Sequence, residues 1–507
     1  MTETHFPLLS VILVLPLIGA VTVGFVCNDR QAKRVALLFA SVELLLTLMV
    51  VGLFNAEQGD QFQLQEQYVW IPRMHIEYLV GVDGIAVLFL PLSALLTLLS
   101  IGASWNSIKH LSRFYFALLL ALESVTLGIF CALDMVLFFL FWELTLPPLF
   151  FLISLWGVGA QRRNAAMKYT LFMLFGGVPL LFAIIILALN HAASMGAEIP
   201  QGLVFNMPML LKTPLPENLQ ALVFLLLLLG FGVKAPLFPF HTWLPTAAME
   251  GPVPVTALLT GLKLGVFGII RFTLPLAPLA TVKYNWALTI LGAVTLLYGA
   301  LIALRQTNLR RLLAFASISH VGLVIMGIAS LTIQGLQGAL LQLFNFSVIA
   351  GSLMLIAGFI QHRLGSNEAI QLGGLAKVVP RLTCAYFLFT LASIGIPGTS
   401  GFPAELLLFL SALLTHPALG FVALIGAIIS AAYMLIFTRR TFFGPILHTP
   451  VAQTQDLRPR ELALLCVPAL LVLIAGLFPT GIFQTTQIAA ESWLQQFQTI
   501  KQQPQDK

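Results

Sequence analysis

Charged residues and cysteines are both scarce in this sequence. Charged residues make up 9% of the 507 positions and hydrophobic residues 59%, whereas an ordinary soluble domain is about 25% charged. The four cysteines are scattered without a C-x-x-C pair, which argues against iron–sulfur and zinc sites. No G-x-G-x-x-G motif follows a strand pattern, and no P-loop is present. We therefore expect a membrane protein that holds no cofactor and no metal of its own.

Apolar runs long enough to cross a bilayer, about 20 residues each, recur along the whole chain. About fourteen can be counted, which predicts an all-α polytopic membrane protein. The first run, residues 6–26, follows no basic segment, so we expect a span and not a signal peptide. Residues 55–80 leave room for a short interfacial segment between the second and third spans.

The basic residues orient these spans. Alternate connections between spans hold 18 of the 26 lysines and arginines, and the opposite connections hold six. Because basic loops stay on the cytoplasmic side of a membrane, we expect both ends of the chain on the other side. The net charge of +6 follows from this bias and gives no indication of nucleic-acid binding.

Several ionisable residues interrupt the apolar runs. A charge near mid-bilayer costs about 2.5–3.5 kcal/mol on insertion scales, so such residues usually face the protein interior and act there. Burial and nearby opposite charges shift pKa values in opposing directions, which lets a chain of such groups pass protons. A proton relay is therefore favoured over static ion pairs that only fix helix packing. The residues concerned are Lys234, Lys263, Glu43, Glu123, Glu143 and Glu405.

Hydroxyl and imidazole groups are weaker candidates for the same relay. Thr256, Thr260 and Lys263 are spaced to share one helical face, where the hydroxyls would satisfy the ammonium or hold water. Membrane threonines also commonly bond back to helix carbonyls. His241 and His320 lie at or inside spans, and a near-neutral pKa suits a proton carrier. A lone membrane histidine is as often an interhelical hydrogen bond.

Prolines interrupt two of the spans. Residues 234–245 contain three prolines and residues 395–405 contain two, so each helix should break there. Broken backbone at membrane depth is tolerated only where it is buried in protein or lines a wet cavity. The spacing predicts two inverted five-helix repeats, spans 4–8 (residues 114–274) and 9–13 (residues 284–440), each with one broken helix. Residues 1–113 would hold the first three spans, and residues 441–507 the fourteenth span and a tail.

At these residues the sequence resembles the antiporter-like membrane subunits of complex I and of its photosynthetic relative. Within that family it is similar to chain 4 of NAD(P)H-quinone oxidoreductases, which carries an acid where Glu405 stands and where sister subunits usually carry lysine. The resemblance implies that Glu143 and Lys234 form a coupling pair, that Lys263 and His320 form the central relay, and that Glu405 is the outlet. The matching segments are Trp142-Glu143 with Pro147-Pro148, residues 233–236 with 241–245, Ser319-His320, and residues 395–402.

Two segments depart from the family pattern. Asn345-Phe346-Ser347 stands where most relatives have His-Gly, so a second relay histidine is missing, and Glu123 is a candidate substitute for it. Residues 244–252 read Leu-Pro-Thr-Ala-Ala-Met-Glu-Gly-Pro, where relatives usually read Leu-Pro-Asp-Ala-His. This second pattern resembles the cyanobacterial variant specialised for CO2 uptake.

The resemblance implies a proton-translocating subunit of a photosynthetic complex I. Ferredoxin or NAD(P)H would reduce plastoquinone through iron–sulfur clusters in other subunits. The expected partners are sister antiporter-like subunits and a CO2-hydrating subunit, in a cyanobacterial thylakoid membrane. Two alternatives remain: a subunit of a multi-component cation/proton antiporter, whose members usually carry lysine at position 405, and a structural scaffold with static charges.

Overall fold

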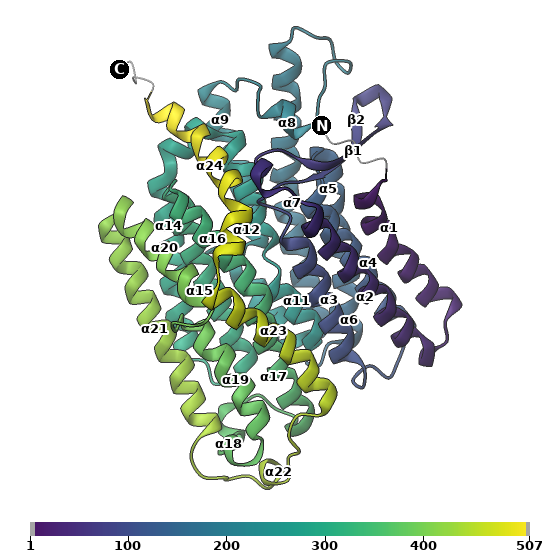
Figure 1. Cartoon of the computed structure of the whole chain (residues 1–507), viewed down its shortest axis with the longest axis vertical. Helices are drawn as coiled ribbons and strands as arrows, with labels where there is room; N and C mark the ends of the chain where they lie inside the picture. The colour runs from purple at the N-terminus through teal and green to yellow at the C-terminus, as the bar shows by residue number, and fades with distance from the viewer. Residues whose placement is uncertain (1–5, 503–507) are drawn as a thin grey trace.

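The computed structural model describes residues 6–502, and helices dominate this part of the chain (Figure 1). Twelve of the described helical segments are long and apolar enough to cross a membrane. Two shorter apolar helices, Phe89–Ser104 and Gly401–Thr415, occupy the third and twelfth predicted spans. The all-α polytopic fold predicted from the sequence is therefore confirmed.

The N-terminal spans are α1 (Leu8–Val21, prolonged by a π-helical turn to Val26), α2 (Asp29–Leu53) and α3 (Phe89–Ser104). They pack against α4 (Ser112–Cys131). Between α2 and α3 lies an antiparallel hairpin of β1 (Gln63–Ile71) and β2 (Ile76–Val82). The sequence allowed for an interfacial segment here but did not predict strands.

The next five spans begin with α4. Some of these spans are continuous helices, and others consist of short helices separated by breaks. The fifth span breaks at Thr145, because Pro147 and Pro148 cannot donate to the preceding turn. The eighth span breaks at Leu262 and Lys263, whose backbones are not helical. The elements are α5 (Met135–Leu144), α6 (Leu146–Trp156), α7 (Arg162–Ser194), α8 (Met207–Leu210), α9 (Glu217–Lys234), α10 (Trp243–Glu250), α11 (Val253–Gly261), α12 (Leu264–Gly268) and α13 (Leu274–Leu276).

The second half repeats this mixture of continuous and interrupted spans. A π-helical turn, Phe346–Ala350, joins α16 to α17 inside the eleventh span. The elements are α14 (Pro278–Leu304), α15 (Leu309–Ala329), α16 (Ile333–Asn345), α17 (Gly351–Leu364), α18 (Leu375–Val378), α19 (Pro380–Ser393), α20 (Gly401–Thr415), α21 (Pro417–Phe442), α22 (Thr449–Ala452), α23 (Pro459–Leu477) and α24 (Thr480–Gln502).

Both proline-rich breaks are present where the sequence predicted them. The seventh span stops at Lys234 and resumes at Trp243, and Lys168 on α7 donates to the Thr242 carbonyl at 2.8 Å. The twelfth span stops at Ser393 and resumes at Gly401, through glycines with positive φ in the gap. The duplication that would relate the two halves stays a prediction.

The region expected to be a C-terminal tail contains a further helix, α24. It packs on α14 and α16, and its Trp493 donates from Nε1 to the Ile270 carbonyl at 3.1 Å. Figure 1 shows α24 (yellow) reaching the same end of the molecule as α8 and the β1–β2 hairpin, whereas α18 and α22 lie at the opposite end. This alternation of connections agrees with the predicted order of spans.

Candidate functional site

Lys234 ends α9 because Ala235-Pro236 cannot continue the helix. Its ammonium Nζ donates to Thr145 Oγ1 at 2.9 Å and lies 3.4 Å from the Trp142 carbonyl oxygen. It also lies 3.9 Å from the centroid of the Trp142 ring, a cation–π geometry. The break between α5 and α6 therefore holds this ammonium, and no carboxylate of residues 6–502 lies within 4.0 Å of it.

Glu143 is close in sequence to the Lys234 contacts but points elsewhere. Successive residues of an α-helix are rotated by about 100°, so Trp142 faces α9 while Glu143 packs against Gly177 of α7. A Cβ at Gly177 would lie 2.3 Å from Glu143 Oε1, and this oxygen is shielded without a hydrogen-bond partner. The structure thus does not bring Glu143 and Lys234 into the ion pair that the resemblance implied.

Lys263 lies at the break between α11 and α12, and 6% of it is exposed. Its Nζ has no hydrogen-bond partner in the described part of the chain and lies 5.0 Å from the centroid of the Phe346 ring. The expectation that Thr256 and Thr260 share a helical face with Lys263 is wrong, because α11 ends at Gly261. Their hydroxyls bond back to the carbonyls of Val253 and Thr256 at 2.9 and 2.8 Å.

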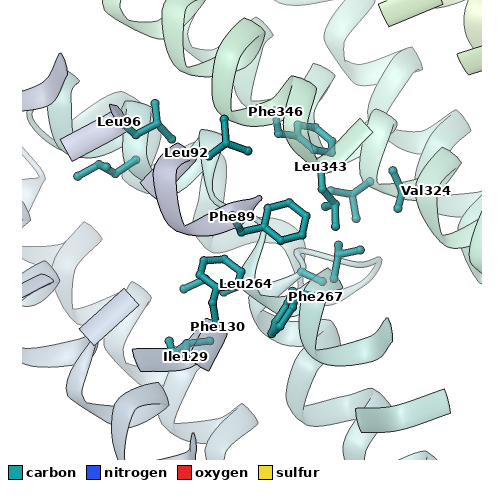
Figure 2. Packing of buried hydrophobic residues seen from close by; sticks show 14 of the residues in the cluster. Phe89, Leu92, Leu96, Ile129, Phe130, Leu264, Phe267, Val324, Leu343 and Phe346 are labelled. Atoms are coloured by element: carbon teal, nitrogen blue, oxygen red, sulfur yellow. The ribbon is translucent and has the colours of Figure 1, made fainter. Parts of the chain in front are cut away.

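Aromatic rings surround the space beside Lys263. Phe89, Phe130 and Phe267 pack together, with ring centroids 4.8–6.0 Å apart. Figure 2 shows these three rings on one side of the cluster and Phe346 with Leu343 on the other. A cavity of about 10 Å³ lies here, close to the minimum of about 10–15 Å³ that a water requires.

The Phe346 ring neighbours both Lys263 and His320. Its centroid lies 5.0 Å from the Lys263 ammonium and 6.4 Å from the His320 ring centroid, and the two rings are edge-to-face. Asn345 beside it donates to Gln342 Oε1 and to the Ser400 carbonyl, both at 3.0 Å. At the position where the resemblance implies a second relay histidine, Phe346 therefore forms an apolar partition next to two members of the row of ionisable groups.

His320 and Glu405 come together across α15 and α20. Nδ1 of His320 is 3.5 Å from Glu405 Oε1, and Nε2 is 3.5 Å from Ser430 Oγ. The Gln342 amide is also 3.5 Å from Nδ1. These distances exceed those of strong hydrogen bonds, which leaves the imidazole loosely held among several polar partners.

Small cavities lie beside the members of this row. One of about 40 Å³ is lined by Lys234, Thr145, Tyr169 and, from the eighth span, Leu262. Another of about 30 Å³ is lined by His320, Gln342, Asn345 and Phe346. Each is large enough for one or a few waters and offers polar partners. With the cavity beside Lys263, they follow the order Lys234, Lys263, His320.

The remaining predicted candidates lie outside this row. His241 is buried in the seventh-span break, where its ring packs on Tyr298 at 4.8 Å and its Nδ1 has no partner. Glu123 on α4 and Glu43 on α2 are buried, and neither carboxyl group has a hydrogen-bond partner. Within residues 6–502, no hydrogen bond or ion pair joins Glu123 to Lys263 or His320, so the structure gives no support for Glu123 as a substitute for the histidine that the resemblance implies.

Sequence reasoning missed the neutral partners of the row. Thr145 and Gln342 contact Lys234 and His320, and Ser430 contacts the far side of His320. Charged residues stand out in apolar spans, whereas single hydroxyls and amides do not. Thr145 alone carried a usable signal, since it lies two residues after Glu143 and directly before a proline-bearing turn.

Comparisons with known proteins place this geometry in a family. A family model described as "NADH:quinone oxidoreductase/Mrp antiporter, TM" matches residues 132–430. A protein of Synechococcus sp. (strain JA-3-3Ab) named "NAD(P)H-quinone oxidoreductase chain 4 1" is 37% identical over 97% of this chain and 94% of its own length. The chain belongs to the NADH:quinone oxidoreductase/Mrp antiporter transmembrane family.

A second curated protein and a solved structure are also similar to this chain. "NADH-quinone oxidoreductase subunit M" of Rhodobacter capsulatus is 35% identical over 93% of both chains. A chain of respiratory complex I from Thermus thermophilus is 30% identical, with a TM-score of 0.87 over 96% of this chain and 99% of that one. The resemblance to chain 4 subunits of quinone oxidoreductases is thus confirmed, and the chain is a multi-pass integral membrane protein.

Proposed function

We propose that this chain is a proton-translocating membrane subunit of a quinone oxidoreductase complex. The observation that carries this proposal is the row of buried ionisable groups Lys234, Lys263, His320 and Glu405, with a cavity beside each of the first three. Water in these cavities would let protons pass between groups that do not touch, whereas His320 and Glu405 are close enough for direct exchange.

The static-scaffold alternative predicts that buried charges are paired, and two such pairs between an arginine and a carboxylate exist among the described residues. Arg271 is bonded to Asp83, and Arg363 to Glu461, in ion pairs with little exposure. Neither Lys234 nor Lys263 has a carboxylate within 4.0 Å among the described residues. The chain therefore pairs its structural charges and leaves the lysines of the row unpaired, which favours the relay.

In the proposed path, a proton on Lys234 passes through water to Lys263 and then to His320 and Glu405. Glu143 would act on Lys234 from a distance, as a charge across the α5–α6 break. The Phe346 ring blocks a continuous chain of water between Lys263 and His320. Transfer across this point would require the ring to move, and the π-helical turn that begins at Phe346 supplies an irregular backbone for such motion.

The finer assignment is a photosynthetic complex I in its CO2-uptake form. It rests on the segment 244–252 and on similarity to a cyanobacterial chain 4. Glu250 in this segment accepts from the Gln161 backbone through Oε2 at 2.8 Å, which ties α10 to the loop before α7. Ferredoxin or NAD(P)H, iron–sulfur clusters and plastoquinone would belong to other subunits. Sister antiporter-like subunits and a CO2-hydrating subunit would be neighbours in the thylakoid membrane, with the basic loops in the cytoplasm.

A reconstituted parent complex tests the proposal. Lys234→Met should abolish most proton uptake into vesicles driven by quinone reduction, and Glu143→Gln should reduce it, while the complex still assembles. Lys212→Met is the matched control, because that lysine is exposed and outside the row. Unchanged proton uptake in the Lys234 variant would contradict the relay. Sodium transport by the chain without quinone reduction would favour the antiporter alternative.

A further inference from the structure

A large cavity at the basic end of the molecule belongs to no part of the proton path. Its volume is about 330 Å³, within the range of about 300–1,000 Å³ that holds small ligands. It lies where the C-terminal ends of α3, α6 and α17 meet the N-terminal ends of α11 and α23. Ala103 of α3, Trp156 of α6 and His362 of α17 line it. Helix ends that meet in this way lie near the membrane surface, at the depth of lipid headgroups. We call this cavity the basic-end pocket.

The walls of the basic-end pocket are apolar on the side of the bundle. Val253 and Pro254 from α11 and Leu355 and Phe359 from α17 form them, and α11 and α17 approach closely because Gly358 faces Val253. A Cβ at Gly358 would lie 2.5 Å from Val253. These walls offer van der Waals contact to a hydrocarbon chain and nothing to a small inorganic ion.

The rim of the pocket is polar and positively charged. Arg458 and Arg460 line it, and neither forms an ion pair among the described residues. Arg460 Nε is shielded from solvent without a hydrogen-bond partner. Glu461 also lines the pocket, but Arg363 neutralises it and the Arg458 backbone donates to it at 2.9 Å. The rim therefore presents two free guanidinium groups, which bind phosphate oxygens well.

We propose that the basic-end pocket binds one anionic phospholipid of the surrounding bilayer. The phosphate would lie against Arg458 and Arg460, and an acyl chain would lie along the walls formed by α11 and α17. Such a lipid would add contacts between α23, α11 and α17 beside the Arg363–Glu461 ion pair that already joins α17 to α23. Basic pockets between membrane helices on the cytoplasmic side are suited to anionic headgroups. This proposal does not depend on proton translocation.

Native mass spectrometry of the purified parent complex tests it, after equilibration with mixed vesicles of phosphatidylglycerol and phosphatidylcholine. Arg458→Gln with Arg460→Gln should lower the affinity for one phosphatidylglycerol by about tenfold for each arginine. Ala103→Leu, which narrows the pocket and keeps its charge, should also displace the lipid. Arg439→Gln with Arg440→Gln is the control, since these exposed arginines lie on α21 outside the pocket.

Three results would overturn the proposal. Equal retention of phosphatidylglycerol in all four proteins would show that the pocket does not hold it. Equal retention of phosphatidylcholine would show that the arginines select no net charge. A map of the parent complex with a protein segment in the pocket would assign the site to a neighbouring subunit. Competition by inorganic phosphate at the same concentration as the lipid would show that the apolar walls contribute nothing, which also contradicts it.

Discussion

Replacing Phe346 with histidine should speed proton transfer between Lys263 and His320. The ring now gives Lys263 only a cation–π contact at 5.0 Å, and Nζ lacks a hydrogen-bond partner. A hydrogen bond to a charged group contributes about 1.5–3 kcal/mol. If the new imidazole supplies one such hydrogen bond in the transition state of proton transfer, the transfer should accelerate about 10- to 150-fold.

The assay is time-resolved proton uptake by vesicles that contain the parent complex, after a single reduction of the quinone. Phe346→Leu is the matched control, because it keeps the partition apolar and should leave the rate no higher than in the wild type. Thermal unfolding of each variant checks the fold, since an unsatisfied buried imidazole would cost about 1–3 kcal/mol. Identical uptake kinetics in the wild type and in both variants would refute the reasoning, because Phe346 would then lie outside the path.

Two further predictions concern the supports of the path. Gly177→Ala should reduce proton uptake while leaving assembly intact, because the new Cβ would lie 2.3 Å from Glu143 Oε1 and force that carboxylate to move. Gly52→Ala is the control, since a Cβ there meets nothing within 4 Å. Equal proton uptake by the two variants would contradict a role for the position of Glu143. Asp83→Asn should destabilise the chain by about 3–5 kcal/mol, because it leaves the buried Arg271 guanidinium unpaired; a melting temperature equal to that of the wild type would show that the pair contributes no stability.

The spans could be predicted from composition because each is an apolar run of bilayer length. Both proline-rich breaks could also be predicted, since proline cannot donate to the helix at Pro236 or Pro397. The break at Lys263 could not, because no proline or glycine pair marks Leu262-Lys263. The β1–β2 hairpin was missed for a different reason: its residues are less apolar than a span, and pairing with a partner strand decides their structure.

The candidate site was only partly predictable. Depth in the spans indicated Lys234, Lys263, His320 and Glu405 as candidates, and the family resemblance implied their order. Which side chains touch depends on helix rotation at the breaks, and the sequence does not show this. Glu143 therefore faces α7, and Phe346 is placed beside two ionisable groups. Arg271 is one of the six basic residues counted in the opposite connections, but it is buried in a π-helical turn and paired with Asp83.

The central claim is that protons pass along the row of buried ionisable groups through water in the cavities beside them. A map of the parent complex that resolves ordered water tests this most directly. We expect water within hydrogen-bond distance of Lys263 Nζ, and more in the cavities beside Lys234 and His320, with the Phe346 ring as the single interruption. Empty cavities beside all three residues would contradict the account and leave the charges without a proton path.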